Sequence, residues 1–263
     1  MVAQRNPAFR AARLPQWTIQ GIRTIDMQHQ YMDIEELRQY LGLDQRRLSK
    51  MAQRGDIPCQ RVGGSYRFNR AEVTEWLQQQ IGSDKHDWSS MDAGVGAHRQ
   101  TGPDDLLIAP MLHEVGVDLS LKARTKASVL RELVALAQLT QRLYDPQALL
   151  EALQRREELC PTALENGIAI PHPRRPQPYA ISEPLMVVAH VPQGIGFGAP
   201  DGRLTHYFFM TCSQDDRHHL QTIARLCRIF SQKNFLVELH DATTPAELIE
   251  QLKLRELTLL ASD

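Results

Sequence analysis

Residues 166–174 read NGIAIPHPR and place one histidine, His172, between two prolines. Proline fixes its own φ angle, so Pro171 and Pro173 restrict the backbone on both sides of the imidazole and hold it in a nearly constant direction. A neutral imidazole is a good nucleophile near pH 7. A solitary histidine after proline is also a common structural feature. His172 therefore indicates a reactive site only if other functional side chains are expected beside it.

Other histidines offer such partners. His218 and His219 lie together in DDRHHLQTIARLCRIFSQ, which has the apolar period of an amphipathic helix. A metal site built from His172, His218 and His219 is disfavoured because no acid or cysteine stands at ligand spacing with them. The four cysteines form no CxxC pair, which argues against a zinc ribbon and a disulfide framework. We therefore predict no metal and no cofactor, a solvent-facing His218, and structural, hydrogen-bonded roles for His190 and His206.

A second group of residues has the chemistry of nucleic-acid binding. Polar and basic side chains follow the helix-capping residue Asp44, and Gly63 and Gly64 in RVGGSYRF permit the positive φ angles of a hairpin turn. Cations neutralise phosphates, and Arg or Gln can form paired hydrogen bonds with base edges. The polar and basic residues in question, whose role in DNA contact is implied by the family resemblance described below, are Gln45, Arg46, Arg47 and Lys50 in the expected helix and Arg61, Ser65, Tyr66 and Arg67 in the expected hairpin.

The elements that would position this group predict a helix-turn-helix within residues 31–82. Asp33 and Glu36 have the spacing of a capping box, and the first helix should end at Gly42. A second helix should run from Asp44 to Gly55, and Asn69 should cap a third helix after the hairpin. Residues 1–30 are expected to be a basic, solvated arm.

The charge distribution agrees with a DNA-binding front half. Residues 1–82 carry 12 Lys and Arg against 8 Asp and Glu, whereas the rest of the chain carries 18 against 23. The excess of positive charge at the front favours DNA as the partner. A solvated helix face, or a domain that binds protein, is the alternative.

The remainder of the chain predicts a larger domain. Residues 83–104 are polar and lack periodicity, so we expect a linker there and a domain at 105–263. LLIAPML suggests a short strand or turn, and LMVVAHV and HYFFMTC are nearly continuous apolar strands that should lie deep in a sheet. Amphipathic helices are expected at 124–138, 146–159, 215–232 and 243–253. Alternation of helices and buried strands predicts an α/β sandwich with a mixed sheet flanked by helices.

Two family resemblances follow from these motifs. RVGGSYRF followed by AEVTEWL resembles the excisionase and MerR-like winged helix-turn-helix family over residues 31–82. This resemblance implies that the second helix enters the major groove and that the glycine-turn wing touches the DNA backbone or the minor groove. The eight candidate residues given above would then face DNA.

The second resemblance covers the larger domain. RREELCPTALENGIAIPHPR, LMVVAHV, FGAPDG and HHLQTIARLCRIF are together similar to the enzyme IIA domain of the fructose/mannitol class of the sugar phosphotransferase system, including its nitrogen-regulatory branch. The resemblance implies that His172 is transiently phosphorylated by the histidine-containing phosphocarrier protein. It also implies that His219 lies beside His172 and that Arg156 helps to hold the phosphoryl group. Thr162 and Arg174 are expected to add contacts, because phosphoryl transfer depends mainly on positioning and charge stabilisation.

Together these features predict a DNA-binding regulator whose IIA-like domain reports nitrogen or carbon status through phosphohistidine, rather than a turnover enzyme. The chain departs from the family pattern at Glu165, which adds negative charge near the expected site. One alternative is therefore an interaction sensor that is not phosphorylated. Another is a phosphocarrier that supplies a sugar permease in trans, with the front domain serving only for docking.

Partners and location follow from the same reasoning. We expect the phosphocarrier protein and double-stranded DNA as partners, and a homodimer is possible because helix-turn-helix proteins usually bind paired half-sites. No apolar run approaches the ~20 residues that span a bilayer, and the N-terminus lacks a secretory apolar segment. A cytoplasmic protein is expected. We also expect phosphorylation to change DNA affinity, by drawing the basic domain towards the negative phosphoryl group.

Overall fold

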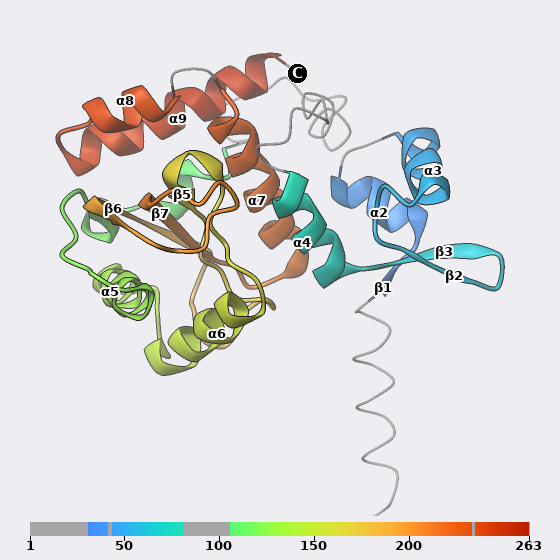
Figure 1. Cartoon of the computed structure of the whole chain (residues 1–263), viewed down its shortest axis with the longest axis horizontal. Helices are drawn as coiled ribbons and strands as arrows, with labels where there is room; N and C mark the ends of the chain where they lie inside the picture. The colour runs from blue at the N-terminus through green and yellow to red at the C-terminus, as the bar shows by residue number, and fades with distance from the viewer. Residues whose placement is uncertain (1–30, 42–43, 81–105, 233–234, 263) are drawn as a thin grey trace, which may run out of the picture.

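The chain forms a small N-terminal unit and a larger α/β unit, which lie side by side (Figure 1). The arm expected at 1–30 and the linker expected at 83–104 lie outside the described residues, so these boundaries stay predictions. No helix in the part of the chain described is both long and apolar enough to cross a membrane. The computed structural model describes residues 31–41, 44–80, 106–232 and 235–262.

The small unit is a winged helix-turn-helix. Its three-stranded sheet has the order β1-β3-β2, and both pairs of strands are antiparallel. Met32, Leu37, Leu48 and Phe68 are completely buried between the sheet and the helices. The elements are β1 (Tyr31–Met32), α2 (Ile34–Leu41), α3 (Gln45–Arg54), β2 (Gln60–Val62), β3 (Ser65–Asn69) and α4 (Arg70–Gln80).

Side-chain caps fix the helices of this unit. The amide of Asp33 donates to the Glu36 carboxylate and the amide of Glu36 donates to Asp33, each at 2.8 Å, which confirms the predicted capping box. The Asp44 carboxylate accepts from the first amides of α3, and Gly55 ends this helix in the left-handed conformation with φ 76°. Asn69 caps α4 in the same way as Asp44 caps α3.

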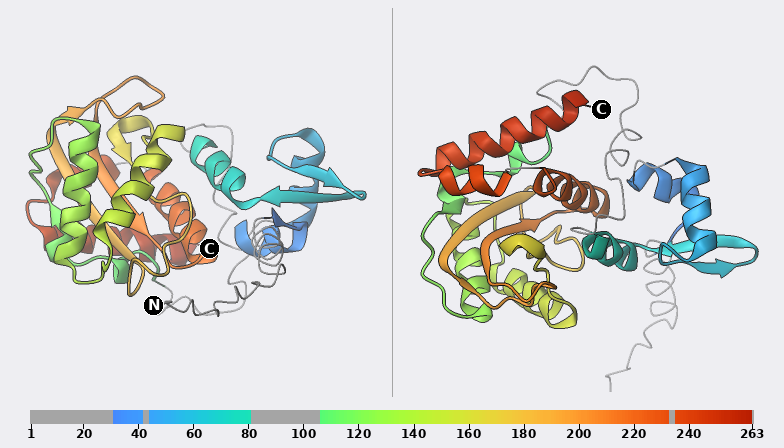
Figure 2. Two further views of the ribbon diagram at one scale, coloured as in Figure 1. Left: turned by 90° about the horizontal axis from the view of Figure 1, so that it is seen from below. Right: turned by 45° about the horizontal axis from the view of Figure 1, so that its top comes forward.

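The hairpin between β2 and β3 is the predicted wing. Val62 is opposite Ser65, so Gly63 and Gly64 alone form the turn. Their φ angles of 58° and 84° are both positive, as a type I′ turn requires. Two views show that the hairpin projects away from the α/β unit (Figure 2).

The α/β unit contains a four-stranded mixed sheet in the order β4-β6-β7-β5. The two long central strands are antiparallel, and each pairs with a short parallel strand at its outer edge. These strands are β4 (Val117–Asp118), β5 (Ile168–Ala169), β6 (Leu185–Ile195) and β7 (Thr205–Cys212).

Both faces of the sheet are covered by helices, which confirms the predicted sandwich. Val187 and Phe208 belong to one apolar cluster with α5 and α6, whereas Val188 and Phe209 belong to a second cluster with α7, α8 and α9. Consecutive strand residues therefore face two separate cores, which explains why the strands lack hydrophobic alternation. The helices are α5 (Lys126–Leu139), α6 (Pro146–Leu159), α7 (Asp216–Phe230), α8 (Phe235–Asp241) and α9 (Pro245–Ser262).

Two parts of this unit differ from the sequence-based expectation. LLIAPML contains the 3-10 helix η3 (Ala109–Met111), and the buried carboxylate of Glu256 in α9 accepts hydrogen bonds from the amides of Leu107, Ile108 and Ala109. A partner 149 residues along the chain thus shapes the segment. Helix α8 was not anticipated, and α9 continues well beyond the expected end at residue 253.

Helix α7 joins the two units. Its Leu220 is 2% exposed and belongs to the apolar cluster of the winged unit, together with Leu37 and Trp76. Helices α2 and α4 both pack against α7 (Figures 1 and 2). The first residue of α4, Arg70, approaches Asp216 at the start of α7, with 4.0 Å between the guanidinium Nε and the carboxylate.

Candidate functional site

His172 lies in the loop that follows β5, and backbone hydrogen bonds fix this loop on both sides. The amide of Ile170 donates to the carbonyl of Thr162 at 3.0 Å, and the carbonyl of Pro171 accepts from the amide of Thr211 in β7, also at 3.0 Å. The two prolines that flank His172 are buried. The loop is therefore attached to the sheet at the residue before the histidine, which leaves the imidazole little freedom.

The hydrogen bond of the His172 ring determines its tautomer. Nδ1 is 2.6 Å from the carbonyl oxygen of Ile170, and because a carbonyl can only accept, Nδ1 carries the proton. In the neutral ring Nε2 then holds the lone pair, so Nε2 is the nucleophilic atom.

His219 lies beside His172, as the resemblance implied. The two ring centroids are 5.2 Å apart, and His219 belongs to the first turn of α7, which Asp215 caps. His219 is 4% exposed, and its Nε2 has no hydrogen-bond partner among the described residues. A buried ring nitrogen that can donate is a suitable partner for a phosphoryl oxygen.

Arg156 completes the basic group. It lies near the end of α6, is 5% exposed, and donates from Nη1 to the carbonyl of Cys160 at 2.7 Å. Arg156 and His172 line the same cavity. A guanidinium held in place by the backbone carbonyl of Cys160 needs little reorganisation to meet an anion.

Burial and positive charge keep both imidazoles neutral. Burial lowers the pKa of His172 well below its usual value, and the neighbouring His219 and Arg156 lower it further. Burial, followed by the charge of Arg156, lowers the pKa of His219 to about 4. Both rings are therefore unprotonated at pH 7, which His172 requires to act as a nucleophile.

Glu157 supports the site and was not singled out from the sequence. Its buried carboxylate accepts from the amide of Thr162 at 3.0 Å, from the Thr162 hydroxyl at 2.6 Å and from Lys126 Nζ at 3.0 Å. The Thr162 hydroxyl is thus engaged with Glu157, and contact with a phosphoryl group would require that hydrogen bond to break. The carbonyl of Thr162 accepts from the amide of Ile170, and the carbonyl of Ile170 in turn orients the His172 ring, so Glu157 supports that ring through Thr162 and Ile170.

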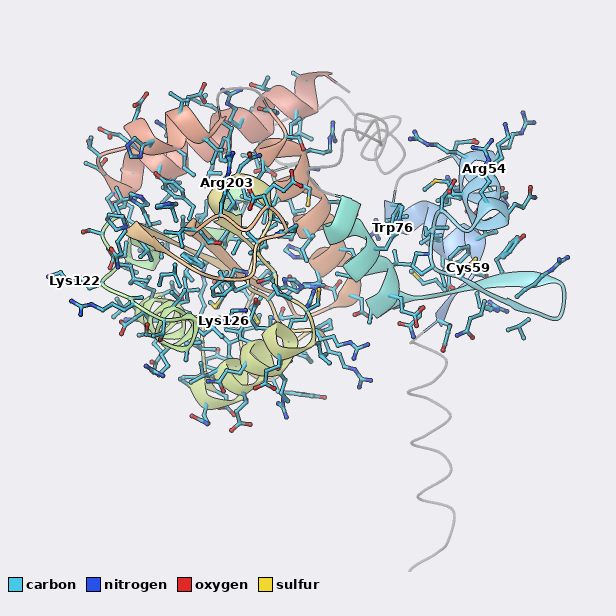
Figure 3. All side chains as sticks on the ribbon, viewed as in Figure 1. Arg54, Cys59, Trp76, Lys122, Lys126 and Arg203 are labelled. Carbon is cyan, nitrogen blue, oxygen red and sulfur yellow. The ribbon has the colours of Figure 1, made fainter. Side chains whose placement is uncertain are left out.

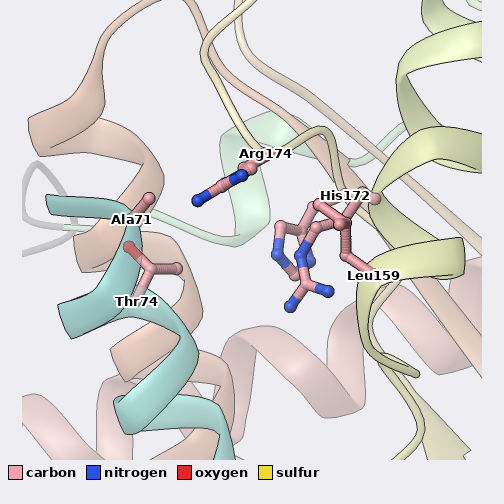
Figure 4. A pocket seen from close by; sticks show the side chains of 6 residues that line it. Ala71, Thr74, Leu159, His172 and Arg174 are labelled. Carbon is pink, nitrogen blue, oxygen red and sulfur yellow. The ribbon is translucent and has the colours of Figure 1, made fainter.

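The cavity beside His172 is small and is shared by the two units. Ala71 and Thr74 of α4 line it together with Arg156, Leu159, His172 and Arg174, and about 20 Å³ is free, which is enough for roughly one water molecule. Figure 4 shows Ala71 and Thr74 on α4 facing the histidine loop, with Arg174 extending towards α4. The contribution of α4 was not predicted, because residues 71 and 74 lie in a different domain of the sequence.

The other candidate residues occupy separate positions. His218 is half-buried and its Nδ1 lies 3.3 Å from the hydroxyls of Ser213 and Thr222, so it is not the fully solvent-facing residue expected. His190 donates from Nδ1 to the carbonyl of Leu119 at 3.1 Å, in keeping with a structural role. Glu165 is not among the residues that line the cavity. Within the described ranges, no group of three or more His, Cys, Asp or Glu is arranged to hold a metal ion.

The elements that carry the residues proposed for DNA contact are α3 and the β2–β3 hairpin, whereas α2 and α4 are the helices of this unit that pack against α7. Arg47 and Tyr66 are partly buried, and the other six are exposed. Figure 3 shows Arg54 at the end of α3, on the side away from the α/β unit. The structure thus brings helix and wing candidates onto an accessible part of the small unit, separate from the histidine site.

Comparison with known proteins gives relatives for the α/β unit. The chain is 25% identical over 145 residues to the PTS system fructose-specific EIIABC component of Bacillus subtilis, covering 54% of this chain but only 22% of that protein. It is 29% identical over 123 residues to the Nitrogen regulatory protein of Bradyrhizobium diazoefficiens, covering 46% of this chain and 77% of the relative.

A solved structure shares this fold. The crystal structure of Nitrogen Regulatory Protein IIA-Ntr from Neisseria meningitidis superposes with a TM-score of 0.51 at 24% identity. The match covers 56% of this chain and 99% of that one. The α/β unit therefore has the fold of an entire IIA protein.

Two family profiles match, one on each unit. Residues 31–81 match the family described as "Helix-turn-helix domain". Residues 110–254 match the family described as "Phosphoenolpyruvate-dependent sugar phosphotransferase system, EIIA 2". Since the second match covers more than half of the chain and includes His172, Arg156 and His219, this protein belongs to the EIIA 2 family of the phosphotransferase system and carries a helix-turn-helix domain in front of it.

Proposed function

We propose that this protein is a DNA-binding regulator whose IIA domain accepts a phosphoryl group on His172. The observation that carries the proposal is the ring geometry: Nδ1–H donates to Ile170, which puts the lone pair on Nε2, and the ring shares a cavity with Arg156 and lies beside His219. The buried, neutral state of both imidazoles supports the same assignment.

The transfer step needs only groups that the chain and a phosphohistidine donor supply. The Nε2 lone pair of His172 forms the new bond to phosphorus, while the bond from phosphorus to the donor's imidazole nitrogen breaks and its electron pair stays with the donor. The Nδ1 proton remains in place, and the Ile170 carbonyl stabilises the positive charge that develops on the ring. Arg156 and His219 are positioned to stabilise the phosphoryl oxygens.

The test is a phosphorylation assay with labelled phosphoenolpyruvate and the general phosphotransferase proteins. We expect acid-labile label on His172, none on His172→Ala, and slower labelling of His219→Ala because a phosphoryl-binding group is lost. His218→Ala is the matched control, since this neighbour in α7 should leave labelling unchanged. Label that persists on His172→Ala would overturn the assignment, and no label on any variant would favour the unphosphorylated sensor.

The winged unit is proposed to bind double-stranded DNA through α3 and the wing. Arg46 and Arg67 are exposed on the helix and the wing respectively, and they can contact phosphates or base edges. In a gel shift with genomic fragments, Arg46→Ala and Arg67→Ala should each weaken binding. Arg155→Ala is the control, because this arginine is exposed on α6 of the IIA domain and its loss should leave binding unchanged. Wild-type affinity in both winged-unit variants would instead favour a protein-docking domain.

The biological setting is part of the same proposal. Relatives named for fructose, mannitol and nitrogen regulation support a role in reporting nitrogen or carbon status to genes. We place the protein in the cytoplasm, where the phosphocarrier and DNA are both accessible, and we propose a homodimer on paired half-sites.

A further inference from the structure

We infer that the winged unit and the phosphocarrier compete for one surface, the face of the IIA domain around His172. The inference rests on the proposed function and adds its regulation. In the structure α4 of the same chain lines the cavity beside His172, and α2 and α4 both contact α7, the helix that carries His219. Release of the winged unit must therefore precede phosphorylation, and a phosphoryl group on His172 must oppose its return.

The first argument comes from α7, where two consecutive side chains have different neighbours. His219 lies beside His172, whereas Leu220 is buried among the apolar residues of the winged unit. Burial of a leucine typically stabilises an interface substantially because its apolar surface leaves water. The docking contact thus begins one residue away from the proposed phosphoryl-binding group.

The second argument comes from access to the acceptor. His172 is 1% exposed, and Ala71 and Thr74 of α4 line the cavity beside it. A donor protein must bring its phosphorus to within about 3 to 3.5 Å of Nε2 before transfer. Helix α4 stands at this side of the cavity (Figure 4), so a second protein has to displace it.

The third argument concerns the product. A phosphoryl group has four heavy atoms and about −1.5 to −2 charges at neutral pH, and it needs hydrogen bonds from several directions. The cavity with α4 in place has about 20 Å³ free, which suits roughly one water molecule. A phosphoryl group on His172 would therefore crowd docked α4, and by linkage a change that weakens docking would favour phosphorylation.

The sequence led us to expect that a phosphorylated IIA face would attract the basic helix α3. The docked arrangement in the structure is different. Helices α2 and α4 contact α7 of the IIA domain. Arg54, at the end of α3, lies on the side of the winged unit away from the α/β unit (Figure 3). The residues proposed for DNA contact are thus not the ones that cover His172.

The principal variant is Leu220→Asp in the full chain, which places a carboxylate in the apolar contact. Its matched control is Gln221→Asp, which adds the same charge at the next, half-exposed position of α7. Leu220→Ala provides a milder change if the aspartate variant fails to fold, as circular dichroism would reveal. Two rates are measured: phosphoryl uptake, and carbethoxylation of His172 by diethylpyrocarbonate followed by peptide mass spectrometry.

We expect Leu220→Asp to raise both rates by at least about 5-fold, the lower end of typical coupling between sites, and Leu220→Ala to raise them less. Gln221→Asp should match the wild type. The carbethoxylation rate needs no phosphotransferase protein, so it tests the docked face independently of the proposed function.

The outcomes separate the two ideas. Unchanged carbethoxylation in folded Leu220→Asp and Leu220→Ala would overturn the docked face. Faster carbethoxylation with equal phosphoryl uptake in wild type and variants would overturn the competition. Faster carbethoxylation with no phosphoryl uptake in any variant would support the docked face and overturn the proposed phosphorylation.

Discussion

Replacement of Glu157 should both destabilise the IIA domain and disturb the acceptor loop, the loop after β5 that carries His172. Its carboxylate is buried and accepts two hydrogen bonds from Thr162, one from the amide and one from the hydroxyl, as well as one from Lys126. In Glu157→Ala the buried amide and hydroxyl of Thr162 lose their partner. The carbonyl of the same residue accepts from Ile170, so the disturbance reaches the group that orients His172.

The size of the effect follows from these contacts. A hydrogen bond to a charged group contributes about 1.5 to 3 kcal/mol, so loss of both Thr162 contacts should cost about 3 kcal/mol or more. The side chain of Lys126 is 35% exposed, so solvent screening reduces the contribution of its ion pair and we add nothing for it. Glu157→Gln keeps one acceptor oxygen and should cost about half as much.

Urea unfolding followed by far-ultraviolet circular dichroism measures this cost. Tryptophan fluorescence is unsuitable because all three tryptophans precede residue 106 and none lies in the IIA domain. Glu158→Ala is the matched control, since this neighbour on α6 is exposed and its replacement should change stability by less than about 0.5 kcal/mol. A loss below about 0.5 kcal/mol for Glu157→Ala would refute the argument. Wild-type phosphoryl uptake by Glu157→Ala would refute the link to the acceptor loop.

Three further predictions concern stability, pH and DNA. Glu256→Gln should cost about 3 kcal/mol or more in urea unfolding, because its carboxylate is fully buried and pairs with Arg225, whereas exposed Glu250→Gln should cost little. The pKa of His219 is about 4 in the folded chain against about 6.5 unfolded, so the unfolded chain takes up this proton at a higher pH than the folded chain. The unfolding free energy is therefore unaffected by His219 above pH 6.5 and decreases as pH falls towards 4. Between pH 7.5 and pH 5 the unfolding free energy should fall by about 2 kcal/mol from this residue, and His219→Gln should lose correspondingly less. For DNA, Arg46→Ala should cost about 1 to 3 kcal/mol if the side chain reads a base, and should instead make the salt dependence of binding shallower if it contacts phosphate, as titrations at several salt concentrations would distinguish.

Much of the fold could be predicted because its determinants are local. Asp33 with Glu36, Asp44 and Asn69 each cap a helix within three residues of their own position, and Gly63–Gly64 fits the turn that joins β2 to β3. Apolar strands without alternation indicated a sheet covered on both faces, as the two clusters on β6 and β7 confirm. Such features depend on short-range geometry, which single residues reveal.

The segments that could not be predicted depend on distant partners. Glu256 accepts from amides at the start of the α/β unit, and Glu157 fixes Thr162 while lying in an apparently ordinary charged stretch, QRREEL. Nothing in the sequence distinguishes these buried carboxylates from exposed neighbours such as Glu158. The pairing of His172 with His219 was anticipated only through the family resemblance, because the two lie 47 positions apart in the chain.

The packing of the two units against each other also could not be predicted from the sequence, and it has a functional consequence. From the sequence, Leu220 is one more apolar residue of an amphipathic helix, with no sign that it leaves the core of its own unit. In the structure it lies in the core of the winged unit, while the adjacent His219 remains in the IIA site. One helix thus carries a group for the phosphoryl site and a contact for the DNA-binding unit on neighbouring positions. Because a helix moves nearly as a rigid body, a change at either side chain is transmitted to the other without a long chain of intermediates. In the competition proposed above, a phosphoryl group on His172 would therefore need to break only the Leu220 contact and its neighbours to release the winged unit.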